Sequence, residues 1–347
     1  MPRSYTSSSL RPYHRSPMRI AFFGSGAFGL PTLDRLSREH EVVAVVTQPD
    51  KPAGRGGKLS PTPIGAWAAA NMPGVALLKP ERVNLPEAVR TIRAFPAEAW
   101  VVIAFGQKLS KDLLADRFAV NLHASLLPRW RGAAPINAAI LAGDPVTGNS
   151  VITLADRMDA GMVLGTSIRT IDPLMTAGEL HDALAQDGPD LVLSVLDRHA
   201  RGLLEPEAQD ESRVTIATKL SKDNDDIDFH QPAAFLRRLV HALTPWPGIT
   251  VVLLPPPGLA GEVAPPSSPS APTSVKLLRV RVEDLRTEQE PGVLIDPKAG
   301  LVACGNGTVL RLLEVQPAGK KPMPWSAFAN GRVILPMMRV VSARQEA

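Results

Sequence analysis

Short apolar runs that alternate with helical patterns constrain the fold of this chain more than any other feature. From Met18 onward, strand-like runs recur at Ile20–Phe23, Glu41–Thr47, Trp100–Phe105, Ala119–His123 and Ser150–Leu154. Short, fully apolar runs of this kind are typical of parallel strands that are covered on both faces. Because helical patterns lie between them, the order of elements predicts a doubly wound α/β domain with a mostly parallel, Rossmann-like sheet over residues 18–205.

Three of the predicted helices in this domain carry local signals. One helical pattern surrounds Pro31–Leu36, and a second has Pro135 in its first turn and Gly143 just past its end. Thr176-Ala-Gly-Glu179 matches a capping box, which opens a long helix running to about Ala200. We expect the Gly188-Pro189 pair to interrupt this last helix.

The pattern of predicted elements changes after residue 213. A helical stretch at Ala233–Ala242 is followed by short alternating runs at Ile249–Leu254, Val275–Val282, Gly292–Ile295 and Val309–Val315. Such runs with turn residues between them predict a small antiparallel β-barrel resembling the OB-fold. We therefore expect a linker over 206–217 and a β-barrel domain over 218–340, with a Pro/Ser-rich flexible insertion at 255–274.

Residues 1–17 are rich in Ser and Arg, contain no acid, and follow no helical or strand period. We predict that they are disordered. Their composition fits a mitochondrial transit peptide, which would place the protein in the mitochondrial matrix. The alternative, which we favour, is an upstream extension with Met18 as the working start of a cytoplasmic, bacterial protein.

Composition limits the classes of protein that this chain can belong to. The single cysteine, Cys304, excludes intrachain disulfides and zinc sites built on a cysteine pair. No apolar run approaches the roughly 18 residues of a spanning helix, and no metal-binding pair of histidines is evident. We therefore expect a soluble, intracellular protein with two domains, no metal and no membrane partner. We also expect it to be a monomer.

The charge of the chain is unevenly distributed. Residues 213–347 hold 16 Lys and Arg against 12 Asp and Glu, and residues 1–17 add three arginines. The intervening residues 18–212 are therefore slightly acidic. This is the pattern of a polyanion-binding part attached to a catalytic domain, although an ordinary surface with a slight excess of arginine explains it as well.

The first motif that could carry chemistry is Gly24-Ser-Gly-Ala-Phe-Gly29, which matches G-x-G-x-x-G between a strand and a helix. In a dinucleotide fold these glycines bring the backbone close to a pyrophosphate, and an acid at the end of the second strand holds the ribose. Here that strand ends in Thr47-Gln48, and Asp50 follows a proline. A tight turn lining a cleft explains the glycines equally well.

The second motif is the basic segment 48–58, Gln-Pro-Asp-Lys-Pro-Ala-Gly-Arg-Gly-Gly-Lys. Its glycines and prolines predict a flexible loop without regular structure, and Lys51, Arg55 and Lys58 keep it cationic. Such a loop at the end of a strand is suited to grip a phosphate backbone, and an ordinary surface loop is the alternative.

The third motif runs from Asn121 to Pro135 and leaves the end of a buried strand. Asn121 and His123 are two residues apart, so their side chains point to the same side of the strand. A polar pair at the end of an apolar strand is costly to bury unless it is hydrogen-bonded or used. A rigid amide and an imidazolium are the donors that stabilise the tetrahedral oxyanion of acyl transfer, which predicts a catalytic pair.

The fourth motif, Asp156-Arg-Met-Asp159-Ala-Gly161, follows another strand. A carboxylate at Asp159 could orient His123 and help to move a proton, whereas an Asx-type turn is the structural alternative. The sequence has no G-x-S-x-G nucleophile elbow.

Several long segments together resemble the methionyl-tRNA formyltransferase family over Met18 to about Leu335. They are TQPDKPAGRGGKL (47–59), NLHASLLPRWRGAAPI (121–136), MDAGMVL (158–164), TKLSKDNDDIDF (218–229) and VQPAGKKPM (315–323). The resemblance implies transfer of a formyl group from 10-formyltetrahydrofolate, a co-substrate, to the amine of methionine on initiator tRNA, for translation initiation. The Pro/Ser-rich insertion, the tail and the loop Gly24–Phe28, which in the family reads more like G-T-P-x-F, depart from the pattern.

The resemblance also implies roles for individual residues. The catalytic residues would be Asn121, His123 and Asp159. The residues that contact folate would be Ser125, Leu126, Leu127 and Pro128. Arg55 would reach the charged end of the tRNA, flanked by Lys51 and Lys58.

Three other functions remain open at this level. One is a folate-dependent formyltransferase acting on a nucleotide or nucleotide-sugar amine, which leaves the basic segment and the β-rich part unexplained. An NAD-dependent dehydrogenase would rest on the glycine motif alone. A tRNA-binding protein without activity would not need Asn121, His123 and Asp159 together.

Overall fold

The computed structural model describes residues 17–53, 57–256 and 272–345. The chain divides into two compact units, Met1–Leu122 with Pro189–Glu205, and His123–Gly188 with Pro206–Ala347. The domain boundaries predicted from the sequence remain a prediction, and most of residues 1–17 and 255–274 lie outside the described residues. Among the described residues, no helix is long and apolar enough to cross a membrane.

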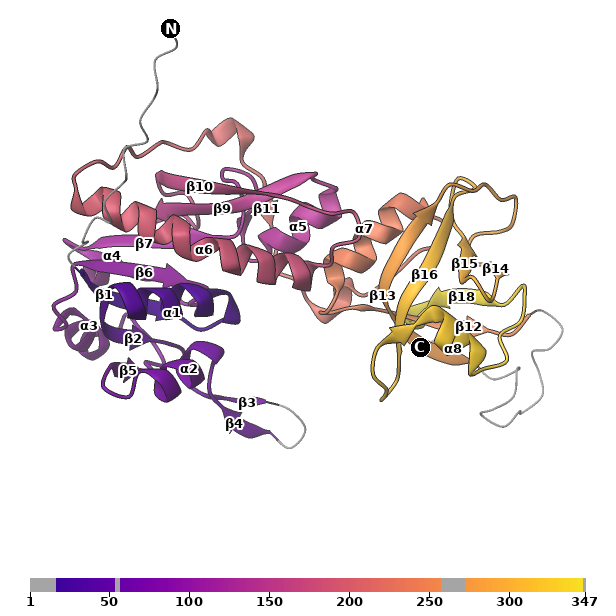
Figure 1. Ribbon diagram of the computed structural model, residues 1–347, viewed down its shortest axis with the longest axis horizontal. Coiled ribbons are helices and arrows are strands. Elements are labelled where there is room, and N and C mark those ends of the chain that lie inside the picture. Colours follow the sequence, from indigo (N-terminus) through magenta and orange to yellow (C-terminus); the bar gives the residue numbers. More distant parts are fainter. Residues whose placement is uncertain (1–16, 54–56, 257–271, 346–347) are drawn as a thin grey trace, which may run out of the picture. The chain divides into compact units, whose positions relative to one another are not determined.

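The first unit is built around parallel strands (Figure 1). Its elements are β1 (Arg19–Gly24), α1 (Leu30–Glu39), β2 (Glu41–Val46), β3 (Lys51–Ala53), β4 (Lys58–Ser60), α2 (Pro63–Asn71), β5 (Ala76–Leu78), α3 (Pro86–Arg93), β6 (Ala99–Ile103), α4 (Lys111–Leu114) and β7 (Phe118–His123). Strands pair in parallel in the order β5-β2-β1-β6-β7. The register sets Phe22 beside Val101, and both side chains are fully buried. The predicted mostly parallel Rossmann-like sheet is thus confirmed.

The second unit begins with the last residue of β7. It continues through β8 (Arg131–Gly132), α5 (Pro135–Ala142), β9 (Val146–Thr153), β10 (Val163–Thr170), the long α6 (Ala177–Ala200, shared with the first unit) and β11 (Ile216–Ala217). Strands β9 and β10 are antiparallel. Helix α5 ends as predicted, because Gly143 adopts a left-handed φ of 79° at its C-cap.

Helix α6 confirms one sequence prediction and corrects another. Its capping box is present, since the Thr176 and Glu179 side chains accept from each other's backbone N–H groups. The predicted interruption at Gly188-Pro189 is wrong, because the helix continues through Pro189 to Ala200. Apolar residues are fully buried on both sides of the proline, including Leu184 and Val192. Their packing outweighs the hydrogen bond that the proline removes.

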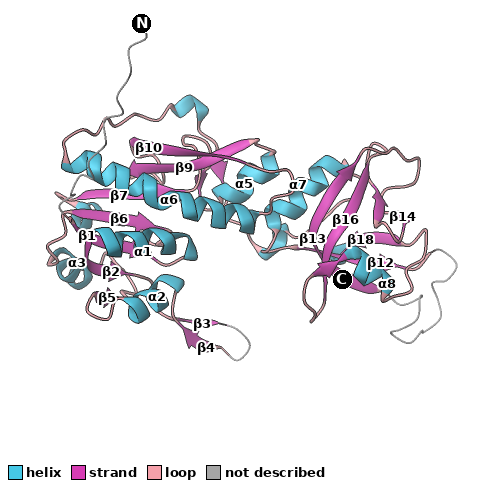
Figure 2. Cartoon of the chain, viewed as in Figure 1, coloured by secondary structure: helices cyan, strands magenta, loops and turns pink. Residues whose placement is uncertain are grey.

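The remainder of the second unit forms an antiparallel barrel (Figure 2). After α7 (Ala233–Leu243) come β12 (Ile249–Leu254), β13 (Thr273–Glu283), β14 (Leu294–Asp296), β15 (Leu301–Ala303), β16 (Val309–Pro317), β17 (Met323–Pro324), α8 (Trp325–Asn330) and β18 (Arg339–Ser342). The order is β14-β15-β16-β13-β12-β18, with β17 on β16. A bridge between Val293 and Arg339 joins the two ends. The predicted OB-like barrel is confirmed, although β15, β17 and β18 were not predicted.

One hydrophobic core fills this barrel. Leu236 and Val240 of α7 are fully buried together with strand residues such as Leu277 and Leu310, and Trp325 of α8 is 2% exposed. Cys304 lies in the same core, and burial raises the pKa of its thiol to about 12. A thiol in such surroundings is a packing group, not a nucleophile.

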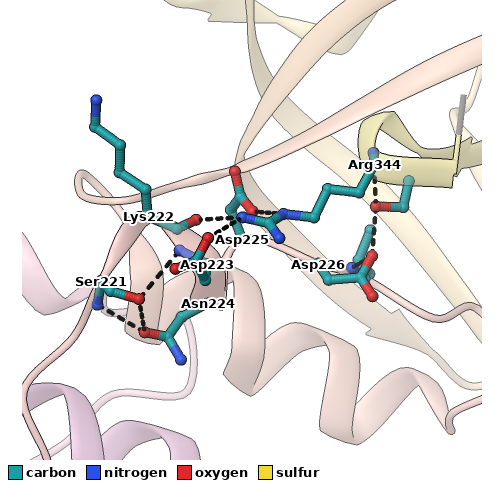
Figure 3. A network of polar contacts seen from close by, with 9 residues as sticks. Ser221, Lys222, Asp223, Asn224, Asp225, Asp226 and Arg344 are labelled. Atoms are coloured by element: carbon teal, nitrogen blue, oxygen red, sulfur yellow. Dashed lines mark hydrogen bonds and ion pairs between the residues drawn. The ribbon is translucent and has the colours of Figure 1, made fainter. Parts of the chain in front are cut away.

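A polar network joins the end of the described chain to residues 222–226, which precede α7 (Figure 3). The Arg344 guanidinium pairs with the carboxylates of Asp223 and Asp225 and donates to the Lys222 carbonyl at 3.0 Å. Ser342, the last residue of β18, donates to Asp226 at 2.6 Å. Most of these groups are exposed, so the network sets position more than stability. It gives the segment 218–229 a structural role.

His241 of α7 gives a prediction for stability against pH. The ring is 1% exposed, and its Nε2 accepts from the Val280 N–H at 3.1 Å. Burial, together with the charges of Arg237 and Arg279, lowers its pKa to about 4, although a hydrogen bond to the Pro173 backbone and the charge of Glu179 act in the opposite direction. Between pH 6.5 and pH 4 the unfolded chain therefore binds a proton that the folded chain does not. As the pH falls through this window we expect His241 to cost up to about 3 kcal/mol of unfolding free energy.

The His241→Gln variant keeps an acceptor for Val280 but does not titrate in this window. Urea unfolding of both proteins at pH 7, 5.5 and 4 measures the difference, in which the contributions of other groups cancel. A variant that loses stability with acid as steeply as the parent would contradict the assignment.

Candidate active site

Strand β7 carries the predicted pair Asn121 and His123 at its carboxyl end. The strand is buried along most of its length, and Asn121 is half-buried whereas His123 is 6% exposed. Because side chains alternate along a strand, the residue between them, the buried Leu122, points to the opposite face. The two polar groups thus project to one side, as predicted from their spacing.

The imidazole of His123 lies between a carbonyl and a carboxylate. Its Nε2 is 2.8 Å from the Trp130 carbonyl oxygen, and its Nδ1 is 3.6 Å from Oδ2 of Asp159. A carbonyl only accepts, so Nε2 carries a proton and donates it to Trp130. The distance to Asp159 is longer than a hydrogen bond. The Nδ1 edge is therefore left facing the carboxylate without being locked to it.

Asp159 occupies a strained position in the loop between β9 and β10. Its φ is 53°, in the left-handed region, which Asp tolerates better than most residues. Its Oδ2 accepts from the Gly132 N–H at 2.9 Å, and its side chain is 14% exposed. Two residues on, a Cβ at Gly161 would lie 1.7 Å from the Thr153 carbonyl oxygen, so only glycine fits there. The structure brings His123 and Asp159 together, as predicted.

Trp130 is a site residue that was not predicted from the sequence. Its φ of 61° is unusual for a bulky residue, and this conformation presents its carbonyl to His123. The indole Nε1 donates to Asp144 at 2.7 Å, and the backbone N–H donates to the Thr215 hydroxyl at 2.9 Å. Arg129 lies 4.9 Å from the indole ring centre. No local sequence signal marks a backbone carbonyl as a partner of a histidine.

The predicted folate segment, Ser125–Pro128, is a tight loop directly after β7. Ser125 is fully buried, and its hydroxyl donates to the Arg129 carbonyl at 2.6 Å. Its own carbonyl accepts from Ser150, whose hydroxyl in turn accepts from the Leu127 N–H. These hydrogen bonds of buried groups hold the loop in its conformation. Leu126 and Pro128 are the partly exposed members, so a ligand contact of this segment would fall mainly on them.

The glycine motif of the first unit forms a tight turn. The backbone N–H groups of Ser25 and Gly26 both donate to the Ala104 carbonyl, at 3.2 and 3.3 Å. A Cβ at Gly24 would lie 2.6 Å from the Phe22 ring. The groups that a pyrophosphate would need are already engaged, and Asp50 pairs with Lys79 at 2.6 Å. This geometry favours the tight-turn interpretation over a dinucleotide site.

The basic segment contains regular structure, which corrects the prediction of an irregular loop. Strands β3 and β4 pair antiparallel, with Lys51 opposite Ser60 and Pro52 opposite Leu59. A proline is tolerated here because a two-stranded ribbon leaves one edge of each strand unpaired. Lys51 and Lys58 are both exposed, and Arg55 lies outside the described residues.

The described residues contain no group of three or more His, Cys, Asp or Glu side chains that could hold a metal ion. The geometry described above assigns the candidate chemistry to Asn121, His123, Asp159 and the carbonyl of Trp130.

Two family models match the chain. One, described as formyl transferase, matches residues 18–196, and the other, described as formyl transferase, C-terminal domain, matches residues 219–333. The chain is 39% identical over 327 residues to the methionyl-tRNA formyltransferase of Rhodopseudomonas palustris (strain BisB18), covering 93% of this chain and 99% of that protein. It is 38% identical over 320 residues to the methionyl-tRNA formyltransferase of Roseiflexus sp. (strain RS-1), covering 91% and 93%.

Solved structures with the same fold are more distant in sequence. HypX from Aquifex aeolicus, solved in complex with tetrahydrofolic acid, is similar with a TM-score of 0.56 and 17% identity over 91% of this chain. This chain spans about half the length of HypX, 47%. An N-formyltransferase from Helicobacter canadensis, solved with folinic acid and dTDP-3-aminofucose, has a TM-score of 0.59 and 12% identity, covering 85% of this chain and 98% of that one.

Proposed function

Because the chain belongs to the methionyl-tRNA formyltransferase family, we propose that its site transfers the formyl group of 10-formyltetrahydrofolate to the amine of methionyl-tRNA. The family assignment rests on 39% identity over nearly the full length of both chains. The observation that carries the chemistry is the His123–Asp159 pair, with Nδ1 and Oδ2 3.6 Å apart.

The reaction is an acyl transfer through a tetrahedral intermediate. The free amine of the methionyl group attacks the formyl carbon, and the carbonyl electron pair moves onto oxygen. The oxyanion then collapses and breaks the bond to N10 of the folate, which takes up the proton that the amine releases. A site for this chemistry needs donors to the oxyanion and a group that moves one proton.

The residues of this chain supply those needs. The Trp130 carbonyl engages Nε2 of His123, so the Nδ1 proton of the imidazolium is the one available to the oxyanion. The amide of Asn121, on the same side of β7, is the second donor. Asp159, with Oδ2 3.6 Å from Nδ1, orients the ring by its negative charge and not by a hydrogen bond, which leaves the Nδ1 proton available to the oxyanion. The same carboxylate accepts the amine's proton for transfer to the leaving nitrogen. Water exclusion comes from burial, since the His123 side chain is 7% exposed.

We assign the substrate contacts to two further segments, the Ser125–Pro128 loop and the basic segment 48–58. We assign the folate contact to the Ser125–Pro128 loop, mainly through Leu126 and Pro128. We assign the acceptor end of the initiator tRNA to the basic segment, through Lys51, Arg55 and Lys58, with the basic barrel as a second contact for phosphates. We propose that the reaction takes place in the cytoplasm, where charged tRNA is consumed in translation. The enzyme is proposed to act as a monomer without a metal.

The proposal is tested with the purified full-length chain. Incubation with 10-formyltetrahydrofolate and methionyl-tRNA is expected to yield N-formylmethionyl-tRNA and tetrahydrofolate in equal amounts. Parallel reactions offer a nucleotide-sugar amine in place of the tRNA and test for NADH binding. Formylation of the sugar amine without formylation of the tRNA would overturn the proposal in favour of that substrate, and NADH binding without formyl transfer would overturn it in favour of a dehydrogenase.

Arg55 provides a prediction that separates tRNA binding from folate binding. It is the central cation of the basic segment, between Lys51 and Lys58 in the sequence. We expect Arg55→Ala to lower kcat/KM for methionyl-tRNA by about tenfold or more, because a charge-assisted contact to phosphate is lost. The KM for 10-formyltetrahydrofolate should change less than about twofold.

Arg90→Ala, which removes an exposed arginine from α3 of the same unit, serves as the matched control and should leave both constants unchanged. Equal losses for the two substrates in Arg55→Ala would show that the segment does not act on the tRNA.

A further inference from the structure

Gln209 makes more polar contacts to the catalytic loop than any residue of the predicted site. It lies between α6 and β11, in the segment 206–217 that is predicted from the sequence to be a linker. Its Nε2 donates to the carbonyls of Asp159 and Gly161, both at 2.7 Å. Its Oε1 accepts from Nε of Arg131 at 2.9 Å. Two carbonyl acceptors on one side and a guanidinium donor on the other determine the orientation of the amide.

These contacts join the two pieces of backbone that hold the Asp159 carboxylate. One piece is the Asp159–Gly161 loop itself, which Gln209 binds on both flanks of the intervening Ala160. The other is β8, where Arg131 binds Gln209 and the adjacent Gly132 donates its N–H to Oδ2 of Asp159. Gln209 therefore fixes the position of the Asp159–Gly161 loop relative to the Gly132 N–H group, which binds the Asp159 carboxylate.

Arg131, the partner of Gln209 on β8, is itself buried and held by further contacts. Arg131 is 5% exposed, and its Nη2 pairs with Glu211 at 2.9 Å. Glu211 also pairs with Arg157, from the loop that precedes Asp159, at 3.0 Å. Strands β8 and β11 pair in parallel, with Arg131 opposite Ile216. The amide of Gln209 is thus held by a buried arginine on a paired strand, while Asp159 has a left-handed backbone conformation that is maintained by its surroundings.

We propose that Gln209 is a positioning residue for formyl transfer, which acts through Asp159 by holding its loop against β8 and so fixing the distance between the carboxylate and His123. The inference rests on the proposed catalytic role of Asp159. Gln209 contacts neither reacting group in this scheme. Its effect on the reaction is through geometry, where displacement of a catalytic group by about 1 Å costs up to about 100-fold in rate.

The test uses the full-length enzyme and a change of one atom. Gln209→Glu keeps the size and the contact to Arg131 but replaces two donors by an oxygen that faces two carbonyls. We expect kcat to fall about 10- to 100-fold, with the KM for each substrate within about threefold of the parent value. Gln209→Met, an uncharged side chain of similar length without donors, carries the test if the first variant does not fold. Gln289→Glu, at an exposed site, is the matched control.

A double-mutant cycle separates positioning from general support of the fold. In an Asp159→Asn background, Gln209→Glu should lower kcat by less than about threefold, because the group through which it acts is already impaired. An equal loss in both backgrounds would show a purely structural role and overturn the inference. If Gln209→Glu is fully active while Asp159→Asn is inactive, the positioning role of Gln209 is wrong but the catalytic role of Asp159 stands. If Asp159→Asn is fully active, both the catalytic role of Asp159 and the positioning role of Gln209 are wrong.

Discussion

Replacing His123 by alanine is expected to lower kcat for formyl transfer by about 10²- to 10³-fold, because one preorganised donor to the oxyanion is lost. The ring contacts the Trp130 carbonyl and Asp159, and both partners can bind water when the ring is removed. Asn121→Ala removes the second donor and should have a comparable effect. Steady-state rates at saturating concentrations of both substrates measure the loss.

His230→Ala is the matched control, because the side chain of His230 is 75% exposed and also contacts an aspartate, Asp228. It should retain the parent rate. Thermal unfolding of each variant checks that the fold is intact. Parent turnover in both His123→Ala and Asn121→Ala would show that the site proposed at the end of β7 is wrong.

Asp159→Asn is expected to be similarly severe, with a loss of about 10²- to 10³-fold in kcat. The amide oxygen of the variant still accepts from the Gly132 N–H, and Asn adopts the left-handed φ of 53° as readily as Asp. The backbone of the loop is thus preserved. What disappears is the negative charge beside Nδ1 of His123, which orients the ring and takes part in proton transfer.

Asp182→Asn removes an aspartate that also lies beside a histidine but is 84% exposed, and it should leave the rate unchanged. Separate measurement of kcat and KM decides the role of Asp159. A higher KM for folate at an unchanged kcat would assign Asp159 to substrate binding.

Much of the candidate site was predictable because it depends on chain-local spacing. Asn121 and His123 share a face of β7 because side chains alternate along any strand. Pairing of His123 with Asp159, 36 positions away, was expected from chemistry and from the family resemblance, and the geometry agrees. The contribution of Trp130 was not predictable, because any residue has a carbonyl and only the folded loop aims this one at the ring.

Ambiguous motifs were resolved only by their surroundings. The motif G-x-G-x-x-G specifies only where the glycines lie. Whether it forms a phosphate site or a tight turn depends on whether its backbone N–H groups are free to bind a ligand. Here the N–H groups of Ser25 and Gly26 donate to the Ala104 carbonyl. Gly188-Pro189 is a local signal for a helix break, yet buried side chains on both sides keep α6 intact. In the basic segment, cross-strand pairing overrides the glycine and proline content around β3 and β4.

The sequence by itself determined the fold class, the barrel and the pair on β7, because apolar periodicity and alternation along a strand act over a few residues. Only the tertiary structure decided which backbone groups meet the functional side chains. The Trp130 carbonyl at His123 and the Gln209 amide at Asp159 bring together residues 7 and 50 positions apart. Such contacts depend on the packing of whole elements, and hydrogen bonds to backbone atoms leave no residue type to recognise.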